Sequence, residues 1–593
     1  MENEIKKRII EHLSFLYGEK TAESVWVKLQ KMLKDFNQQN PELANNMFQF
    51  SEQDAILVTY GDQLRSRTEA PLHTLHKFLK IYLKDTVNGI HILPFFPYSS
   101  DDGFAIIDYA KIDLGLGTWD DIEAIAQNYK LMIDFVLNHI SSQSSWFEEF
   151  KAGNQAYQDF FILVEPGTDL SSIVRPRALP LITPVETSQG TKYVWTTFST
   201  DQIDLNFTNP AVTIQMVEIL LEYIRRGAKI IRLDAIAYLW KIIGTPSIHL
   251  PQTHHFVKLL RSILDAIAPG VILITETNVP YQENISYFGK PLDLKIGENI
   301  IHTSDEAQMV YQFSLAPLVL HAFQHQDTTK LSDWAAGISK PIPGAVFFNF
   351  LASHDGIGIR PAEGMLDSTE IQLLVERTLQ NGGQVSYKNN PDGSKSPYEL
   401  NITLYDWLAE PDDPSEEIAI ERFMASQAIM LSLIGVPGIY FHSLIGSSNC
   451  DTCVAETGRA RSINREKLSW VELITQFDNP QSRTNQIFTK YVQLLAIRRK
   501  HPAFHPSAPQ QILQLDSRIV SVLRLAVNSG GVILALINVT GQFVRSDIDQ
   551  INLNLPAVSK WLDLITNEEI NSASGKLQMT FSPYQYLWLT PAD

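Results

Sequence analysis

The stretch Gly227-Ala-Lys-Ile-Ile-Arg-Leu-Asp-Ala-Ile-Ala-Tyr238 decides the fold of this chain. Its run from Lys229 to Leu233 is short and β-branched, which is typical of a buried parallel strand. The run ends in Asp234, a carboxylate at the point where such a strand meets its C-terminal loop. Arg232 lies two residues earlier, so both side chains leave the same face of the strand. An adjacent arginine lowers the pKa of a carboxyl group, which predicts an ionised nucleophile; a structural salt bridge is the alternative.

Three further stretches have the same form, an apolar run that ends in side chains suited to catalysis. They are Asp134-Phe-Val-Leu-Asn-His139, Ile272-Leu-Ile-Thr-Glu-Thr277 and Phe348-Asn-Phe-Leu-Ala-Ser-His-Asp355. With the first stretch they resemble, in order and approximate spacing, the four signature regions of the α-amylase superfamily. The resemblance runs from about Leu57 to Arg499 and is strongest to the sucrose phosphorylase group. The motifs that indicate this group are Leu93-Pro-Phe-Phe-Pro97, Asp101-Asp-Gly-Phe104, Arg175-Pro-Arg177 and Gly458-Arg-Ala-Arg-Ser-Ile-Asn-Arg465.

Eight short apolar runs alternate with helical patterns along the body of the chain, as in βα units. They predict an α/β fold, a (β/α)8 TIM barrel whose C-terminal loops carry the chemistry. The expected strands are Ala55–Tyr60, Gly89–Phe95, Leu131–Leu137, Lys229–Asp234, Val271–Glu276, Met309–Leu315, Ala345–Leu351 and Gly438–Phe441.

The pattern also predicts how the chain divides into domains. Residues 1–50 have helical periodicity and predict an N-terminal helical extension, which resembles the longer glucosylglycerate and glucosylglycerol phosphorylases. The catalytic barrel is expected over residues 51–505. By the resemblance it carries an inserted domain B at about 140–208, and a long loop region is expected at about 356–430. Residues 506–593 read as short strands separated by turn signals and predict a C-terminal antiparallel β-sandwich.

Composition limits the class of protein and its partners. Of the 593 residues, 44% are hydrophobic and 19% are charged, as in soluble proteins of more than one domain. No apolar run is long enough for a membrane span and the N-terminus lacks an apolar signal core, so we expect a cytoplasmic protein without a membrane partner. A formal net charge of −18 argues against nucleic acid. The expected partners are a small sugar substrate and inorganic phosphate, and a homodimer is left open.

Other motifs predict neither a metal nor a cofactor. The chain has two cysteines, Cys450 and Cys453, and one C-x-x-C pair does not complete a four-ligand zinc site. We expect reduced thiols, although the spacing permits a disulfide and a redox switch. His321 and His325 are four residues apart without the adjacent glutamate of a metalloprotease. No phosphate-loop or dinucleotide fingerprint occurs.

The resemblance implies a retaining reaction at a glucosidic bond, which needs two carboxyl groups roughly 5–5.5 Å apart. It makes Asp234 the nucleophile and Glu276 the general acid/base, with Asp355 as the third carboxylate on the sugar hydroxyls. Glu276 follows an apolar run, so burial should raise its pKa toward the acid role.

The remaining site residues are also implied by the resemblance. Asp101 and Arg465 match a pair that grips the sugar 4-hydroxyl and closes the pocket, so that a single glucosyl unit is transferred. The histidines and Phe104 have structural or core roles as alternatives. The glucosyl subsite is expected to contain Asp101, Phe104, His139, Arg232, His354 and Arg465, and the phosphate and acceptor site Arg177, Tyr238, Phe198, Gln202 and Asn278.

Departures from sucrose phosphorylases indicate a different acceptor. Asn278 replaces their histidine, and Tyr398-Glu-Leu-Asn401 and Thr277-Asn-Val-Pro280 resemble the glucosylglycerate and glucosylglycerol members. We therefore expect a phosphorylase that transfers glucose from glucosylglycerate to phosphate. Sucrose or glucosylglycerol as donor, and a hydrolase or transglucosidase, are the alternatives. Arg177 is the first candidate for the glycerate carboxylate, with Arg459, Arg461 or Lys395 as assistants.

Overall fold

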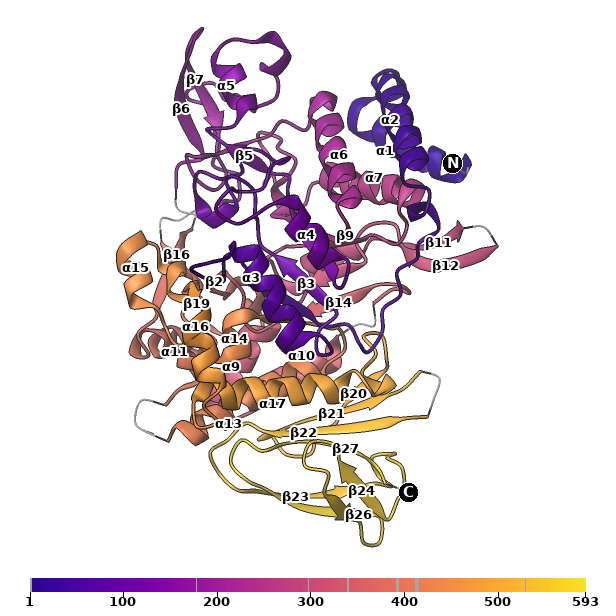
Figure 1. The fold of residues 1–593 in the computed structure, drawn as a ribbon, viewed down its shortest axis with the longest axis vertical. Helices are drawn as coiled ribbons and strands as arrows, with labels where there is room; N and C mark the ends of the chain where they lie inside the picture. The colour runs from indigo at the N-terminus through magenta and orange to yellow at the C-terminus, as the bar shows by residue number, and fades with distance from the viewer. Residues whose placement is uncertain are drawn as a thin grey trace.

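The computed structural model describes residues 3–176, 179–296, 298–338, 341–390, 394–410, 415–527 and 530–592. At its centre, eight parallel strands close into a barrel (Figure 1). Around the barrel the order is β1 (Ile56–Thr59), β18 (Val436–Tyr440), β14 (Val346–Asn349), β13 (Met309–Tyr311), β10 (Ile272–Thr275), β9 (Ala228–Asp234), β4 (Lys130–Val136) and β3 (Gly89–Ile92). The predicted TIM barrel is confirmed, and each of its strands overlaps a predicted run, although β4, β9 and β18 begin one or two residues earlier than expected.

The register of the central strands shows how residues 227–238 bring charged side chains together in the barrel. In the parallel ladder, Arg232 of β9 lies beside Asp134 of β4 on one side and Ile274 of β10 on the other. Because side chains alternate along a strand, Arg232 and Asp234 project to the same face. The strand predicted over Met309–Leu315 is shorter than expected, since β13 ends at Tyr311 and helix α9 (Leu315–His325) begins at Leu315.

Helices connect the barrel strands, and two N-terminal helices pack on them. The longer ones are α3 (Pro71–Phe78), α4 (Trp119–Ala126), α6 (Pro210–Arg225), α7 (Pro251–Ile267), α10 (Thr329–Gly337), α13 (Glu416–Ser432), α16 (Trp470–Phe477) and α17 (Arg483–Arg498). The first two helices, α1 (Asn3–Tyr17) and α2 (Glu19–Gln39), contact α7 and α6. Their apolar faces, with Ile9, Leu13, Leu29 and Leu33, are fully buried in the main core.

Two long connections build the walls above the barrel. Between β4 and β9 lie β5 (His139–Ser141), α5 (Ser145–Lys151), β6 (Ile182–Thr187), β7 (Gly190–Trp195) and β8 (Gln202–Asp204), where β5 pairs with β8. Between β14 and β18 lie β15 (Ile357–Gly358), α11 (Ser368–Gln380), β16 (Gln384–Asn389), β17 (Lys395–Asn401) and α12 (Leu404–Leu408). A separate hairpin, β11 (Pro291–Ile296) with β12 (Asn299–Ser304), follows β10 and projects from the body in Figure 1.

The C-terminal part is antiparallel, as predicted. Six strands form one sheet in the order β20 (Gln510–Ile512), β21 (Ile519–Leu525), β22 (Val532–Asn538), β27 (Tyr586–Pro591), β24 (Lys560–Asp563) and β25 (Glu569–Asn571). A second sheet pairs β23 (Val544–Asp549) with β26 (Lys576–Phe581), and side chains of both sheets share one buried cluster. Within the described part of the chain, no helix has the length and apolar character of a membrane span.

Candidate active site

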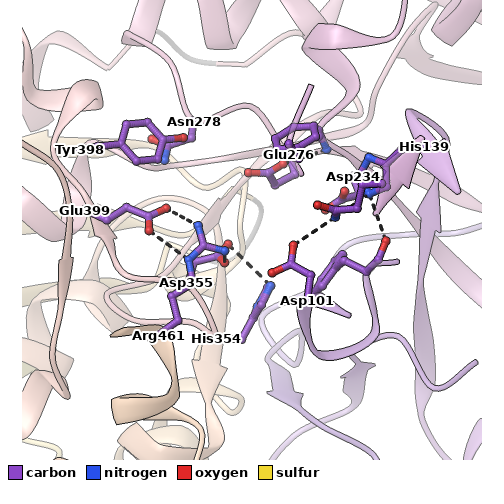
Figure 2. Close-up of a pocket in the computed structure, with 14 residues that line it drawn as sticks. Asp101, His139, Asp234, Glu276, Asn278, His354, Asp355, Tyr398, Glu399 and Arg461 are labelled. Carbon is purple, nitrogen blue, oxygen red and sulfur yellow. Dashed lines mark hydrogen bonds and ion pairs between the residues drawn. The ribbon is translucent and has the colours of Figure 1, made fainter. Parts of the chain in front are cut away.

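Most of the predicted site residues line one pocket at the C-terminal ends of the barrel strands (Figure 2). Asp234 ends β9, Glu276 follows β10, and His139 opens the connection after β4. The pocket has about 530 Å³ of space between its atoms, part of which is open solvent. Its lining consists of Asp101, Phe104, His139, Phe198, Gln202, Asp234, Ala235, Glu276, Asn278, His354, Asp355, Tyr398, Glu399 and Arg461.

A buried chain of charges supports Asp234. The Arg232 guanidinium donates to Asp234 Oδ1 at 2.7 Å and also binds Asp134, and its Nε donates to the Tyr311 hydroxyl at 3.1 Å. On the far side of Asp134, His91 Nε2 lies 2.7 Å from Oδ2. Although burial opposes ionisation, His91 and Arg232 hold the pKa of Asp134 at about 2. Arg232 therefore shares its charge between two carboxylates, and it lies beneath the pocket rather than in its lining.

Glu276 is fixed against the loop that follows Asp234. Its Oε2 accepts a hydrogen bond from the Ala235 N–H at 2.9 Å, and Arg232 Nη2 lies 4.0 Å away. Ala235 has φ 47°, a left-handed conformation that is unusual for alanine and marks local strain at this site. The contact places the predicted acid next to the predicted nucleophile.

The protonation of this pair corrects one prediction. We expected Arg232 to lower the pKa of Asp234, but burial outweighs the arginine, and with the charge of Glu276 it raises that pKa to about 7. Burial also raises the pKa of Glu276, against the pull of Arg232. Each carboxyl group is therefore harder to ionise than a free one, and the two compete for a proton. Asp234 has the direct bond to the guanidinium, so the proton belongs on Glu276 when the pair is half ionised.

The third carboxylate, Asp355, belongs to a triad that the sequence did not predict. Arg461 binds Asp355 Oδ1 through Nη1 at 2.5 Å, and it binds Glu399 through Nε at 3.0 Å and Nη2 at 2.5 Å. Although burial opposes it, Arg461 holds the pKa of Asp355 well below its usual range, and His354 and Arg465 add to the effect. Arg461 was predicted as an assistant for anions, but two carboxylates already occupy it.

The opposite side of the pocket holds the groups expected to bind the sugar. Gln202 Nε2 lies 3.1 Å from Asp101 Oδ2 and 3.0 Å from His139 Nε2, and the Phe104 ring stacks on His354 with centroids 5.1 Å apart. Burial lowers the pKa of His139 to about 4 and that of His354 to about 3, so both rings are neutral at pH 7.

Arg465 and Tyr238 differ from their expected places. Arg465 binds Asp102 and the His354 carbonyl, at 2.6 Å for the latter, rather than pairing with Asp101. Asp101 and Asp102 both have positive φ, so this turn presents two neighbouring carboxylates in different directions. Tyr238 is not in the lining; its ring contacts Phe198 edge-on at 5.7 Å. The predicted Arg177 lies outside the described residues.

Tyr398 and Glu399 in the lining were missed as site residues. Both come from β17, far in sequence from the signature regions. The available signal was the departure at Tyr398-Glu-Leu-Asn401, which indicated an altered acceptor loop without a role for either side chain. Among the described residues, no group of three or more histidine, cysteine or acidic side chains is arranged to hold a metal.

The cysteine prediction is wrong in this structure. Cys450 and Cys453 form a disulfide, with Cα atoms 5.3 Å apart. The C-x-x-C spacing begins helix α15 (Asp451–Thr457), where the first helical turn brings the two sulfurs together. Helix α15 leads into the 3-10 segment that precedes Arg465.

The fold and the carboxyl groups at the strand ends define a class of enzyme that acts on glycosidic bonds. The family model for the α-amylase catalytic domain matches residues 78–358. The chain belongs to the α-amylase family, within its sucrose phosphorylase group, so the resemblance of the motifs is confirmed.

Its full-length similarity is to glucosylglycerate phosphorylases. That of Allomeiothermus silvanus is 48% identical over 594 residues, 99% of each chain. That of Escherichia coli is 40% identical over 586 residues, 99% of this chain and 100% of the relative. The crystal structure of sucrose 6F-phosphate phosphorylase from Thermoanaerobacter thermosaccharolyticum covers 91% of this chain and 99% of its own, with a TM-score of 0.71 at 22% identity. That last likeness concerns the fold alone.

Proposed function

We propose that this protein is a glucosylglycerate phosphorylase. It transfers one glucosyl unit from 2-O-α-glucosylglycerate to inorganic phosphate and releases glycerate and α-glucose 1-phosphate. The observation that carries the proposal is the pairing of Asp234 and Glu276 beside a pocket with Asp355, in a chain 40–48% identical to glucosylglycerate phosphorylases along its whole length.

In the first step Asp234 attacks the anomeric carbon and forms a glucosyl ester, while the glucosidic C–O bond breaks. Glu276 gives its proton to the departing glycerate oxygen, which the raised pKa of the carboxyl group favours. In the second step phosphate attacks the anomeric carbon, the ester bond breaks, and Glu276 takes up the phosphate proton. Two inversions retain the α configuration.

The other side chains hold the sugar while its charge develops. Asp355, kept ionised by Arg461, accepts hydrogen bonds from the sugar 2- and 3-hydroxyls in this proposal. The neutral His139 and His354 rings supply hydrogen bonds without competing for charge. Phe104, which is stacked on His354 and lines the pocket, supplies an apolar contact to the sugar.

The experiment is a donor screen in phosphate buffer, with glucose 1-phosphate as the readout. Glucosylglycerate should give a higher kcat/KM than sucrose or glucosylglycerol, and NMR should show the α-phosphate. If sucrose gives the highest kcat/KM, or if the product is the β-phosphate, the assignment is wrong. Glucose release that does not depend on phosphate would favour a hydrolase.

We also propose a cytoplasmic location, because the charge of the sugar phosphate product keeps it inside a cell. A homodimer is the oligomeric state included in this proposal, and light scattering of the purified protein measures the molar mass that tests it.

A further inference from the structure

Arg360 differs from the other arginines near the pocket in how its charge is balanced. Arg232 and Arg461 each bind carboxylates at 2.7 Å or less, and Arg465 binds Asp102. The acid that the structure places near Arg360 is Glu283, with Oε2 at 3.8 Å from Nη2. The Glu283 side chain is 46% exposed and also contacts His249, whereas that of Arg360 is 17% exposed. Arg360 thus offers a sheltered and weakly paired positive charge.

The backbone before Arg360 contacts two residues of the pocket lining. Ile359 N–H donates to the Tyr398 carbonyl at 3.0 Å. Gly358 lies so close to Asn278 that an added Cβ would meet Asn278 Oδ1 at 2.7 Å. Figure 2 shows Asn278 and Tyr398 on the opposite side of the pocket from His139 and Asp101. Arg360 therefore belongs to the side away from the predicted glucosyl groups.

The acceptor is expected on that same side. Asn278 lines the same pocket as Glu276, the predicted donor of the proton to the leaving oxygen. Because Asn278 lies away from the predicted glucosyl groups, we place the leaving group beside it. The Asn278 Oδ1 atom is buried and has no hydrogen-bond partner among the described residues. A buried acceptor of this kind calls for a donor, which a glycerate hydroxyl supplies.

Tyr238 links Arg360 to the site. Its ring packs edge-on against Phe198 of the lining. Burial raises the pKa of Tyr238 to about 12, and the neighbouring Arg360 opposes this rise by its charge and by hydrogen bonding. The charge of Glu276 also acts on the Tyr238 hydroxyl, so the tyrosine is within electrostatic reach of both the predicted acid and the arginine.

We propose that Arg360 determines acceptor specificity by binding the carboxylate of the glycerate leaving group, with Tyr238 positioning its guanidinium and Asn278 Oδ1 accepting from a glycerate hydroxyl. A guanidinium fork matches a carboxylate in shape and charge, and neutral glycerol lacks that partner. Because this role rests on the proposed function, the test must separate the two.

The test compares Arg360→Ala with the unmodified enzyme on glucosylglycerate and on glucosylglycerol, which differ by the carboxylate. The ratio of kcat/KM for the two donors should fall about ten- to hundredfold, mainly through KM for glucosylglycerate. Arg360→Lys should recover part of the ratio and Arg360→Gln none of it. Arg225→Ala is the matched control. Arg225 also pairs with a glutamate, Glu222, but its side chain is 43% exposed at the end of helix α6, so this variant should leave the ratio unchanged.

Each outcome decides. An unmodified enzyme without preference for glucosylglycerate overturns the proposed function and this role together. If the unmodified enzyme prefers glucosylglycerate and the Arg360→Gln variant keeps the same ratio of kcat/KM for the two donors, only the role of Arg360 is overturned. Equal losses on both donors, or a rise in KM for phosphate with an unchanged ratio, also contradict it. If Arg360→Ala does not fold by circular dichroism, the glutamine and lysine variants carry the comparison.

Discussion

Replacement of Arg461 by alanine should damage both the stability and the activity of the enzyme. The change removes the 2.5 Å contact to Asp355 and the two contacts to Glu399 at 3.0 and 2.5 Å. The two carboxylates that lose this partner are sheltered from solvent: the Asp355 side chain is 24% exposed and the Glu399 side chain is 4% exposed. Leaving buried charges without a partner costs about 3–5 kcal/mol. Asp355 keeps His354 and Arg465 at 3.6 Å, which favours the lower end of that range.

For a chain of 593 residues that unfolds cooperatively, such a loss lowers Tm by roughly 2–4 °C. The pKa of Asp355 is lowered in the folded state, so the stability it contributes is present above about pH 4 and is lost as pH falls through the folded value. The difference in Tm between the two proteins should therefore narrow below about pH 4. Displacement of Asp355 should lower kcat/KM about a hundredfold or more.

Two variants separate the effect on stability from the effect on activity: Arg461→Ala, and a double variant with Glu399→Gln and Arg461→Met. Calorimetry measures the Tm of each, and a phosphorolysis assay measures kcat/KM. The double variant removes one charge of each sign and fills the space, so it should regain stability without regaining activity. If Arg461→Ala keeps the Tm and kcat/KM of the parent, the triad is not what orders Asp355. Full activity in the double variant would likewise refute the reasoning.

Asp234→Asn should abolish turnover, because the variant has no carboxylate to form the ester. It should also be more stable than the parent at pH 8, with a smaller difference at pH 5 and none below about pH 4. The folded pKa of Asp234 is raised, so the stability that this group contributes is fully present below its unfolded pKa of about 4 and is lost as pH rises through about 7. A lower Tm than the parent at pH 8 would contradict this. Glu276→Gln should lose most activity on glucosylglycerate but much less on α-glucosyl fluoride, whose leaving group needs no proton; equal losses on both donors count against the acid role. Reduction of the Cys450–Cys453 disulfide should change kcat/KM by less than about twofold, because so short a closed loop restrains little of the chain; a larger effect that Cys450→Ser removes would indicate a redox switch.

The barrel and the carboxyl groups were predictable because their signals are local. Each strand is a short apolar run, and Asp234 and Glu276 stand at the ends of two such runs. Once the runs close into a parallel barrel, all strand ends with the same direction meet at one face. Closeness in space therefore follows from the fold and needs no further information from the sequence.

The triad and Arg360 were not predictable in the same way. Glu399 and Arg461 come from separate connections, 62 residues apart, and meet through the path of the chain above the barrel. Sequence identifies a cation such as Arg461 but not the carboxylates that occupy it. The same difficulty explains the error for Asp234, since the neighbouring Arg232 is visible in the sequence and the burial that outweighs it is not.

The charge balance of the pocket explains why phosphorolysis here requires a cation beyond the described lining. That lining contains five acidic residues, Asp101, Asp234, Glu276, Asp355 and Glu399, and Arg461 as its arginine. Arg461 is already bound to two carboxylates, and Arg232 beneath the pocket is shared between two more. A phosphate anion that enters this field is repelled unless a further positive charge lies along its path. In a retaining cycle glycerate leaves before phosphate attacks, so a weakly paired cation on the acceptor side can meet the two anions in turn without ever holding both.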